Sequence, residues 1–266
     1  MVIDFHTHVF PENIAARTIS ALEAKANMKA ATDGTINGLL TSMDKAQVDT
    51  SIILPVVTKP AQFESVNNFA RTVNKQYEGR LISFGGIHPD SENYKAELDY
   101  IKELGLKGVK IHPDYQGVMI DDVRFMRIIE YADALGLIIV THAGVDIGIP
   151  EPVHCPPDKM RKVLDTIKPE RMVLAHYGGW KQWEEVYDCL AGENVYLDTA
   201  FTFDFIEDDV FLKILEKHDK DKILFATDSP WSHVERDIAK LNSLPIDSDV
   251  KEMILYGNAA KLLQIK

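Results

Sequence analysis

Residues 93–113 read NYKAELDYIKELGLKGVKIHP, and they contain one full copy of the repeating unit that decides the fold. An amphipathic helical pattern over Asn93–Leu104 stops at Gly105, a residue type that commonly terminates helices. After two further residues comes the apolar run Gly108–Ile111, which is too short for a buried helix. Its β-branched residues indicate a strand buried on both faces, and His112 stands directly after it.

The same unit recurs along the whole chain, about once every 30 residues. The eight apolar runs are Val2–Phe5, Thr50–Leu54, Leu81–Ile87, Gly108–Ile111, Leu137–Thr141, Met172–Ala175, Val195–Leu197 and Ile223–Ala226. Helical patterns between them predict the α/β class and a closed (β/α)8 TIM barrel, in a single domain over residues 1–266. An open doubly wound sheet is the alternative, but the GxGxxG fingerprint typical of it does not follow the first run.

The longest connection between two runs covers residues 12–48. Two helical patterns lie in it, around Ala15–Met28 and Ile36–Gln47, joined by the polar turn Thr32-Asp33-Gly34. We therefore expect a helical insertion after the first strand that overhangs the top of the barrel.

Composition limits the partners. The 266 residues are 45% hydrophobic and 26% charged, as in ordinary globular proteins. A formal net charge of −12 disfavours nucleic acid and acidic membranes, and no apolar stretch approaches the roughly 20 residues of a membrane span. Without a leader-like N-terminus, and with Cys155 and Cys189 outside any CxxC pair, we expect a cytoplasmic protein that acts on a small molecule. A homodimer is possible, but the sequence does not decide it, because no stripe of residues marks an interface.

Histidines gather at the ends of the predicted strands. Six of the nine stand there: His6, His8, His88, His112, His142 and His176. Asp228 follows the eighth run in the same way. Barrel enzymes carry their active sites at the C-terminal ends of the strands, and histidine is the commonest metal ligand and general base.

His6-Thr7-His8 is the sharpest motif. Residues two apart in a strand face the same side, so we expect Asp4, His6 and His8 to point into the barrel. On the same alternation, Ile3 and Phe5 should point to the surrounding helices. Two imidazoles placed in this way can share one divalent ion. Together with His142, His176 and Asp228 at other strand ends, they predict a metal centre.

Lys110 shares its predicted face with His112. Three uses stay open for an inward lysine: binding a substrate carboxylate, pairing with an acid such as Asp4, or becoming carbamylated and bridging two metals. His112 and His88 each precede a proline, so either orienting a loop or a direct chemical role is open to them.

The remaining candidates are weaker. His154 and Cys155 lie in a proline-rich loop that could reach over the site, but simple exposure in a loop is the preferred explanation. His218 and His233 are interpreted as surface residues. Trp180 and Trp231 follow strand ends and form either an aromatic wall or part of the core. The chain contains no GxSxG, P-loop or HExxH pattern.

With these residues assembled, the sequence resembles the amidohydrolase superfamily, and within it the branch that includes aminocarboxymuconate-semialdehyde decarboxylase. The resemblance rests on residues 3–8 (IDFHTH), 108–113 (GVKIHP) and 226–231 (ATDSPW), and on His142 and His176. It implies a metal, usually zinc, held by His6, His8, His142 and Asp228.

The resemblance also implies catalytic roles. His176 would orient or deprotonate the metal-bound water, and Asp228 would accept its proton. Other branches of the superfamily hold a second ion with a carbamylated lysine, so Lys110, His176 and His112 are candidates for a second metal or for the substrate. We favour one ion, because the whole pattern is nearer the one-metal branch.

Two reaction types fit this site. The preferred interpretation is a metal-dependent hydrolase that acts on a small amide, lactone or ester-like bond through a metal-activated water. The alternative is a metal-dependent decarboxylase or hydratase, a lyase, acting on a small unsaturated or aromatic carboxylic acid. An anionic substrate is acceptable despite the net charge, because the ion and Lys110 make the site locally positive. A barrel that binds a metabolite without turnover is the non-enzymatic alternative.

Overall fold

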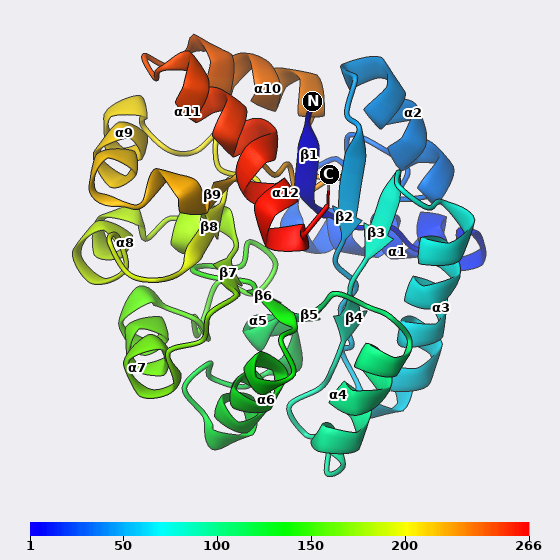
Figure 1. Ribbon diagram of the computed structural model, residues 1–266. Coiled ribbons are helices and arrows are strands. Elements are labelled where there is room, and N and C mark those ends of the chain that lie inside the picture. Colours follow the sequence, from blue (N-terminus) through cyan, green and yellow to red (C-terminus); the bar gives the residue numbers. More distant parts are fainter. Residues whose placement is uncertain (266) are drawn as a thin grey trace.

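A computed structural model describes residues 1–265. Its strands form a ring at the centre of the molecule, and the helices surround that ring (Figure 1). The strands are β1 Ile3–Thr7, β2 Thr50–Ile53, β3 Leu81–Ser83, β4 Gly85–Gly86, β5 Gly108–Ile111, β6 Ile138–Thr141, β7 Met172–Leu174, β8 Tyr196–Asp198 and β9 Ile223–Leu224. All their pairings are parallel. Each one overlaps a run predicted from the sequence, and β3 and β4 share the run Leu81–Ile87.

The strands close into a barrel across two seams. They are ordered β1-β2-β3 and β4-β5-β6-β7-β8-β9. At one seam, β3 and β4 are consecutive pieces of one strand, and Phe84 between them donates its N–H to the carbonyl of Ile53 at 2.9 Å. At the other, the N–H of Phe5 donates to the carbonyl of Phe225 at 2.9 Å. Counting β3 and β4 as one strand gives the eight strands of a (β/α)8 barrel, which confirms the predicted fold.

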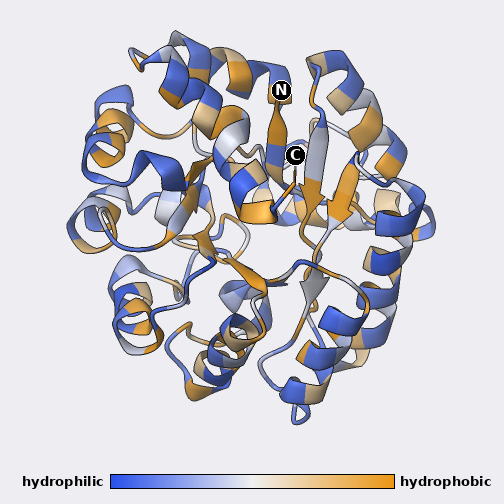
Figure 2. Ribbon diagram, in the orientation of Figure 1, coloured by the Kyte–Doolittle hydropathy of each residue, from blue (hydrophilic) through white to orange (hydrophobic). Residues whose placement is uncertain are grey.

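The helices shield the barrel from solvent. They are α1 Glu12–Ala26, α2 Ile36–Ala46, α3 Phe63–Gln76, α4 Tyr94–Glu103, α5 Pro113–Gln116, α6 Val123–Ala134, α7 Pro157–Ile167, α8 Trp183–Cys189, α9 Asp208–Lys217, α10 Val234–Ser243, α11 Ser248–Glu252 and α12 Asn258–Leu263. Figure 2 shows hydrophobic strands and helices that alternate hydrophobic and hydrophilic residues, as expected for amphipathic helices packed on a buried sheet. Within residues 1–265, no helix is both long and apolar enough to cross a membrane.

The insertion after β1 has the two helices that the sequence predicts. Helix α1 buries Ala15 and Ile19, and α2 buries Leu39 and Met43. The hydroxyl of Thr35 caps α2 by accepting the N–H of Gly38 at 2.9 Å. This packing holds the insertion against the barrel. Its other faces can therefore line the space above the strands.

One strand departs from the simple alternation expected of it. The register of β1 against β2 shifts between Asp4 and Thr7. Ile3 and Phe5 pack in the barrel interior with α12, which lies across the middle of the ring (Figure 1), and not against the outer helices as predicted. The carboxylate of Asp4 accepts hydrogen bonds from the N–H and the hydroxyl of Thr227, at 3.0 and 2.6 Å. The prediction that Asp4 points into the barrel together with His6 and His8 was therefore wrong.

Candidate metal centre and its cavity

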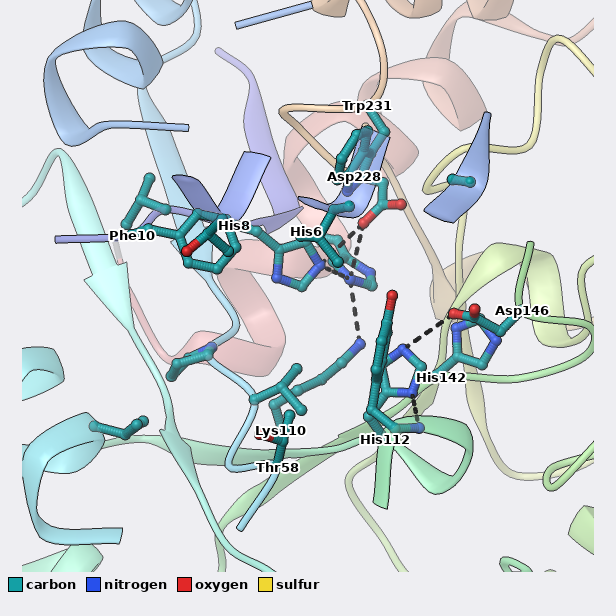
Figure 3. Close-up of a pocket in the computed structure, with 18 of the residues that line it drawn as sticks. His6, His8, Phe10, Thr58, Lys110, His112, His142, Asp146, Asp228 and Trp231 are labelled. Carbon is teal, nitrogen blue, oxygen red and sulfur yellow. Dashed lines mark hydrogen bonds and ion pairs between the residues drawn. The ribbon is translucent and has the colours of Figure 1, made fainter. Parts of the chain in front are cut away.

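Three of the predicted metal ligands converge at the C-terminal end of the barrel. The Nε2 atoms of His6 and His8 lie 3.1 Å apart. Oδ1 of Asp228 lies 3.4 Å from His6 Nε2 and 3.0 Å from His8 Nε2. Figure 3 shows the three side chains pointing toward one another, with Lys110 approaching from the opposite side.

The hydrogen bonds of the two imidazoles determine which nitrogen is free to bind a metal. Nδ1 of His6 lies 2.9 Å from Oδ2 of Asp198, and Nδ1 of His8 lies 2.8 Å from the carbonyl of Leu54. Because both partners are acceptors, we assign the protons to Nδ1, which leaves lone pairs on both Nε2 atoms.

Three lone-pair-bearing atoms at such short separations repel one another unless a cation lies among them. Their separations are those of neighbouring ligands about 2.0–2.2 Å from one divalent ion. The residues therefore fit such an ion, and Asp198 fits the role of a carboxylate that orients a ligating histidine.

Backbone contacts bring Asp228 to the histidines. Its N–H donates to the carbonyl of His6 at 2.8 Å, across the seam between β1 and β9. Its φ is 66°, and His176 at the end of β7 has a φ of 58°. Non-glycine residues adopt this left-handed backbone infrequently, and such positions cluster at functional sites.

His142, the fourth predicted ligand, belongs to a neighbouring cluster. Its Nδ1 lies 3.0 Å from Nε2 of His176, whose own Nδ1 lies 2.9 Å from the carbonyl of Ala200. The ligand atoms of His112, His142 and Asp146 lie within 4.8 Å of one another, and the rings of His112 and His142 are stacked at 4.3 Å. The structure thus groups His6, His8 and Asp228, and places His142 with His176 and His112 beside them.

A buried carboxylate faces the far side of His142. Nε2 of His142 and Oδ2 of Asp114 lie 3.7 Å apart, and neither has a hydrogen-bond partner among residues 1–265. A proton on Nε2 directed at Asp114 would leave the lone pair of His142 on Nδ1, which faces the centre of the site. Oδ1 of Asp114 is held by Nδ1 of His154 at 3.0 Å.

Two predictions of surface exposure were wrong. His154 and Cys155 are buried, because the loop after β6 folds down onto Asp114. His218 is also buried: its Nε2 lies 2.9 Å from the carbonyl of Val195, and its Nδ1 accepts the N–H of Gly192. His233 is exposed, as expected.

The two histidines that precede prolines differ. His88 accepts the N–H of Asp90 and does not line the cavity, which agrees with the loop-orienting interpretation. His112 lines the cavity and caps α5 by accepting the N–H of Tyr115 at 3.3 Å.

Burial keeps the site histidines neutral. It lowers the pKa of His6, His112 and His142 well below the usual value and that of His176 to about 4. Neutral imidazoles can offer lone pairs to a metal ion at neutral pH.

Lys110 is the cationic group of the site. It is buried at the end of β5, and its Nζ lies 3.2 Å from Nε2 of His6. Burial lowers the pKa of Lys110 to about 8, against the opposing attraction of Asp198 and Asp228. The ammonium is therefore present at neutral pH, and its carboxylate neighbours are these two residues, not Asp4.

Three carboxylates of the site escaped the sequence interpretation: Asp114, Asp146 and Asp198. Asp198 directly follows the seventh apolar run, so the criterion that selected Asp228 would have selected it too. Burial raises the pKa of Asp198, while the Lys110 ammonium and the backbone N–H groups of Ala200 and His176 oppose that shift. Asp114 lies in the short helix α5 and Asp146 in the loop after β6, where the sequence pattern carries no comparable signal.

The side chains at the strand ends that form the inner end of a cavity of about 600 Å³ are His6, His8, Lys110, His142, His176 and Asp228. Trp180 and Trp231 both line it, which favours the aromatic-wall interpretation of these residues. A close backbone approach helps to shape it, because the N–H of Val145 donates to the carbonyl of Trp180 at 3.0 Å. Gly144 permits this contact: its φ is 82°, and a Cβ there would lie 2.1 Å from the nitrogen of Trp180.

Comparison with known proteins gives both a family and structural relatives. A family model described as Amidohydrolase matches residues 3–265. No curated protein sequence matches the chain.

Three solved structures illustrate the structural likeness. The 5-carboxyvanillate decarboxylase from Sphingomonas paucimobilis has 17% identity and a TM-score of 0.72, over 100% of this chain and 99% of its own. A 2,6-dihydroxybenzoate decarboxylase complexed with 2,6-dihydroxybenzoate has 14% identity and a TM-score of 0.73, over 99% of each chain. The dihydroxybenzoic acid decarboxylase from Polaromonas sp. JS666, with bound manganese and the inhibitor 2-nitroresorcinol, has 15% identity and a TM-score of 0.73, over 99% of this chain and 96% of its own. At these identities the likeness shows the shared fold.

Proposed function

The chain belongs to the amidohydrolase family, and from this premise we propose that it is a divalent-metal-dependent decarboxylase of a small aromatic or unsaturated carboxylic acid. Decarboxylation was the alternative in the sequence interpretation, and hydrolysis was preferred. The order changes because the three structural relatives described above are decarboxylases of aromatic acids.

One observation carries the proposal. Three metal-binding atoms and the Lys110 ammonium share the inner end of a cavity whose other walls are largely apolar. An aromatic carboxylate matches a cavity with a cationic inner end and apolar walls, since its charge can face the cations while its ring contacts the walls. Its negative charge is also favoured over a neutral amide or ester by the buried ammonium.

His6, His8 and Asp228 would hold the ion, and His142, whose ligand atoms are grouped with those of His112 and Asp146, would lie beside it. A bound divalent ion supplies a Lewis acid that polarises a substrate oxygen. Two imidazoles and a carboxylate suit both zinc, the metal expected from the sequence, and manganese, which the Polaromonas relative contains. We favour a single ion, because Lys110 as an ammonium lacks the carbamate group that would bridge a second ion.

The remaining steps fall to the protein's own side chains. Lys110 pairs with the substrate carboxylate and orients it. When carbon dioxide leaves, the carbon–carbon bond breaks, its electron pair stays on the substrate carbon, and that carbon takes up a proton. His176 holds its Nδ1 proton against the carbonyl of Ala200, so its Nε2 can take up a proton from water and deliver it to that carbon, while the hydroxide left behind combines with carbon dioxide as bicarbonate. Asp228 would hold the ion and assist this proton transfer.

The proposal is tested by assaying hydroxybenzoates, lactones and amides with the manganese- and zinc-loaded protein. We expect at least one aromatic acid to yield carbon dioxide and the decarboxylated arene in equal amounts, measured by bicarbonate release and chromatography. The His8→Ala variant should lose this activity. Hydrolysis of a lactone or an amide, with no carbon dioxide from any acid, would overturn the proposal in favour of hydrolysis.

A further inference from the structure

The cavity is larger than a ligand confined to its inner end would need. Its volume of about 600 Å³ is in the range of sites for drug-sized ligands, which are larger than a single benzoate ring. The metal-binding atoms and Lys110 all come from the ends of strands. The rest of the wall comes from the loops after other strands, from the insertion after β1 and from α3, and the last two form a second part of the cavity that is not made of strand ends.

Helix α1 presents one row of residues to this second part. Ile14, Thr18, Leu22 and Ala26 line the cavity, and each lies four residues after the one before it. Side chains at this spacing share one face of a helix. All four are half-buried, unlike the face of α1 that packs against the core.

Helix α3 and the start of the insertion form the facing side. Val66 and Phe69 of α3 line the cavity and are half-buried, as is Phe10. Figure 3 shows Phe10 on the side of the histidines away from Asp146. The side-chain oxygen of Gln62, also in this wall, is already occupied by the N–H and the hydroxyl of Thr58, at 2.9 and 3.0 Å. The wall therefore offers mainly apolar contact.

Charge is confined to the inner end. Among the lining residues of the described chain, Lys110 is the single lysine or arginine, and the carboxylates are Asp146 and Asp228. A second anionic group on a ligand would lie along the α1–α3 wall without a cationic partner. Burying an unpaired charge is costly, so this wall selects against dicarboxylates with the second charge far from the first.

We propose that the substrate is an aromatic carboxylate with an apolar substituent, an alkyl chain or second ring, on the side of the ring opposite the carboxylate. The substituent lies along the wall made by Ile14, Leu22, Val66 and Phe69, while the carboxylate faces Lys110. This inference rests on the proposed function and deepens it by naming the substrate class. The competing possibilities are that only solvent lies along this wall, or that another protein covers it.

The test is a chain-length series. Calorimetry on the metal-loaded protein with 4-methyl-, 4-propyl- and 4-pentyl-2-hydroxybenzoate should show Kd falling about two- to fourfold per added methylene, the upper value being that of a fully buried CH₂. The Leu22→Asn variant should reduce the ratio of methyl to pentyl Kd by at least about threefold. Leu40→Asn is the matched control, because Leu40 is a half-buried leucine in α2 that does not line the cavity, and it should retain the wild-type ratio.

A Kd that is independent of chain length, or a Leu22→Asn variant with the wild-type ratio, would overturn this inference. The measurement is one of binding, so it does not depend on turnover. Chain-length-dependent binding without release of carbon dioxide from any acid would leave the apolar wall established and refute decarboxylation. Release of carbon dioxide with no chain-length effect would support decarboxylation and refute the apolar substituent.

Discussion

Replacing Asp198 by asparagine tests the role assigned to this buried carboxylate. Its Oδ2 lies 2.9 Å from Nδ1 of His6, and its Oδ1 accepts the N–H groups of His176 and Ala200 at 3.1 and 3.0 Å. In the Asp198→Asn variant, the amide oxygen can keep the two backbone contacts, so the amide NH₂ faces His6. A donor there favours the tautomer of His6 that carries its proton on Nε2, where the metal should bind.

The expected effect is a loss of metal affinity without a loss of fold. A hydrogen bond to a charged group contributes about 1.5–3 kcal/mol, and removing the carboxylate that orients a ligating histidine typically weakens metal binding about 10–100-fold. We therefore expect Kd for Mn²⁺ and Zn²⁺ to rise about 10–100-fold in Asp198→Asn. Competition with a chromophoric chelator measures this change, and thermal unfolding of the metal-free protein verifies the fold.

Asp165→Asn is the matched control, because Asp165 is exposed and pairs only with Arg161 among the described residues. It should leave metal affinity unchanged. A folded Asp198→Asn variant whose Kd lies within twofold of the wild-type value would refute the reasoning, since His6 would then need no oriented proton.

Three further predictions follow from the same structure. His176→Ala should retain most of the metal while turnover falls about 10²–10⁴-fold, measured by elemental analysis and carbon dioxide release; loss of half of the bound metal would instead indicate two ions. Lys110→Met should lower kcat/KM for an aromatic acid about 10–100-fold, the value of one charge-assisted hydrogen bond, whereas an unchanged kcat/KM would exclude carboxylate binding by Lys110. Burial raises the pKa of Asp237 to about 7, so the folded protein holds this proton between about pH 4 and 7 while the unfolded chain releases it. The free energy of unfolding should therefore fall as pH rises through this range, by up to about 4 kcal/mol from Asp237, and Asp237→Asn should show a smaller decline in urea titrations at pH 5 and 8.

The barrel was predictable because strands buried on both faces leave short apolar runs that differ from the longer amphipathic helices. All eight runs became strands, and the insertion has its two helices. The failures came from contacts that no local pattern encodes. The register shift between Asp4 and Thr7 arises where β1 pairs with β2, and the burial of His218 depends on its contact with Val195, 23 residues earlier.

The candidate site was predictable as a set of strand ends, but not as a set of oriented atoms. His6, His8 and Asp228 come together as the sequence indicated. The sequence does not show which nitrogen of each imidazole faces the centre, because that depends on acceptors such as Asp198 and the carbonyl of Leu54. Nε2 of His142 likewise faces Asp114, a residue of the short helix α5.

The central claim is that two histidines and one aspartate hold a catalytic ion at the inner end of the cavity. An anomalous difference map from crystals of the manganese-loaded protein tests it most directly. The account predicts one peak about 2.0–2.2 Å from Nε2 of His6, Nε2 of His8 and Oδ1 of Asp228. No peak within coordination distance of these three atoms, or a peak held only by His112 and Asp146, would contradict it.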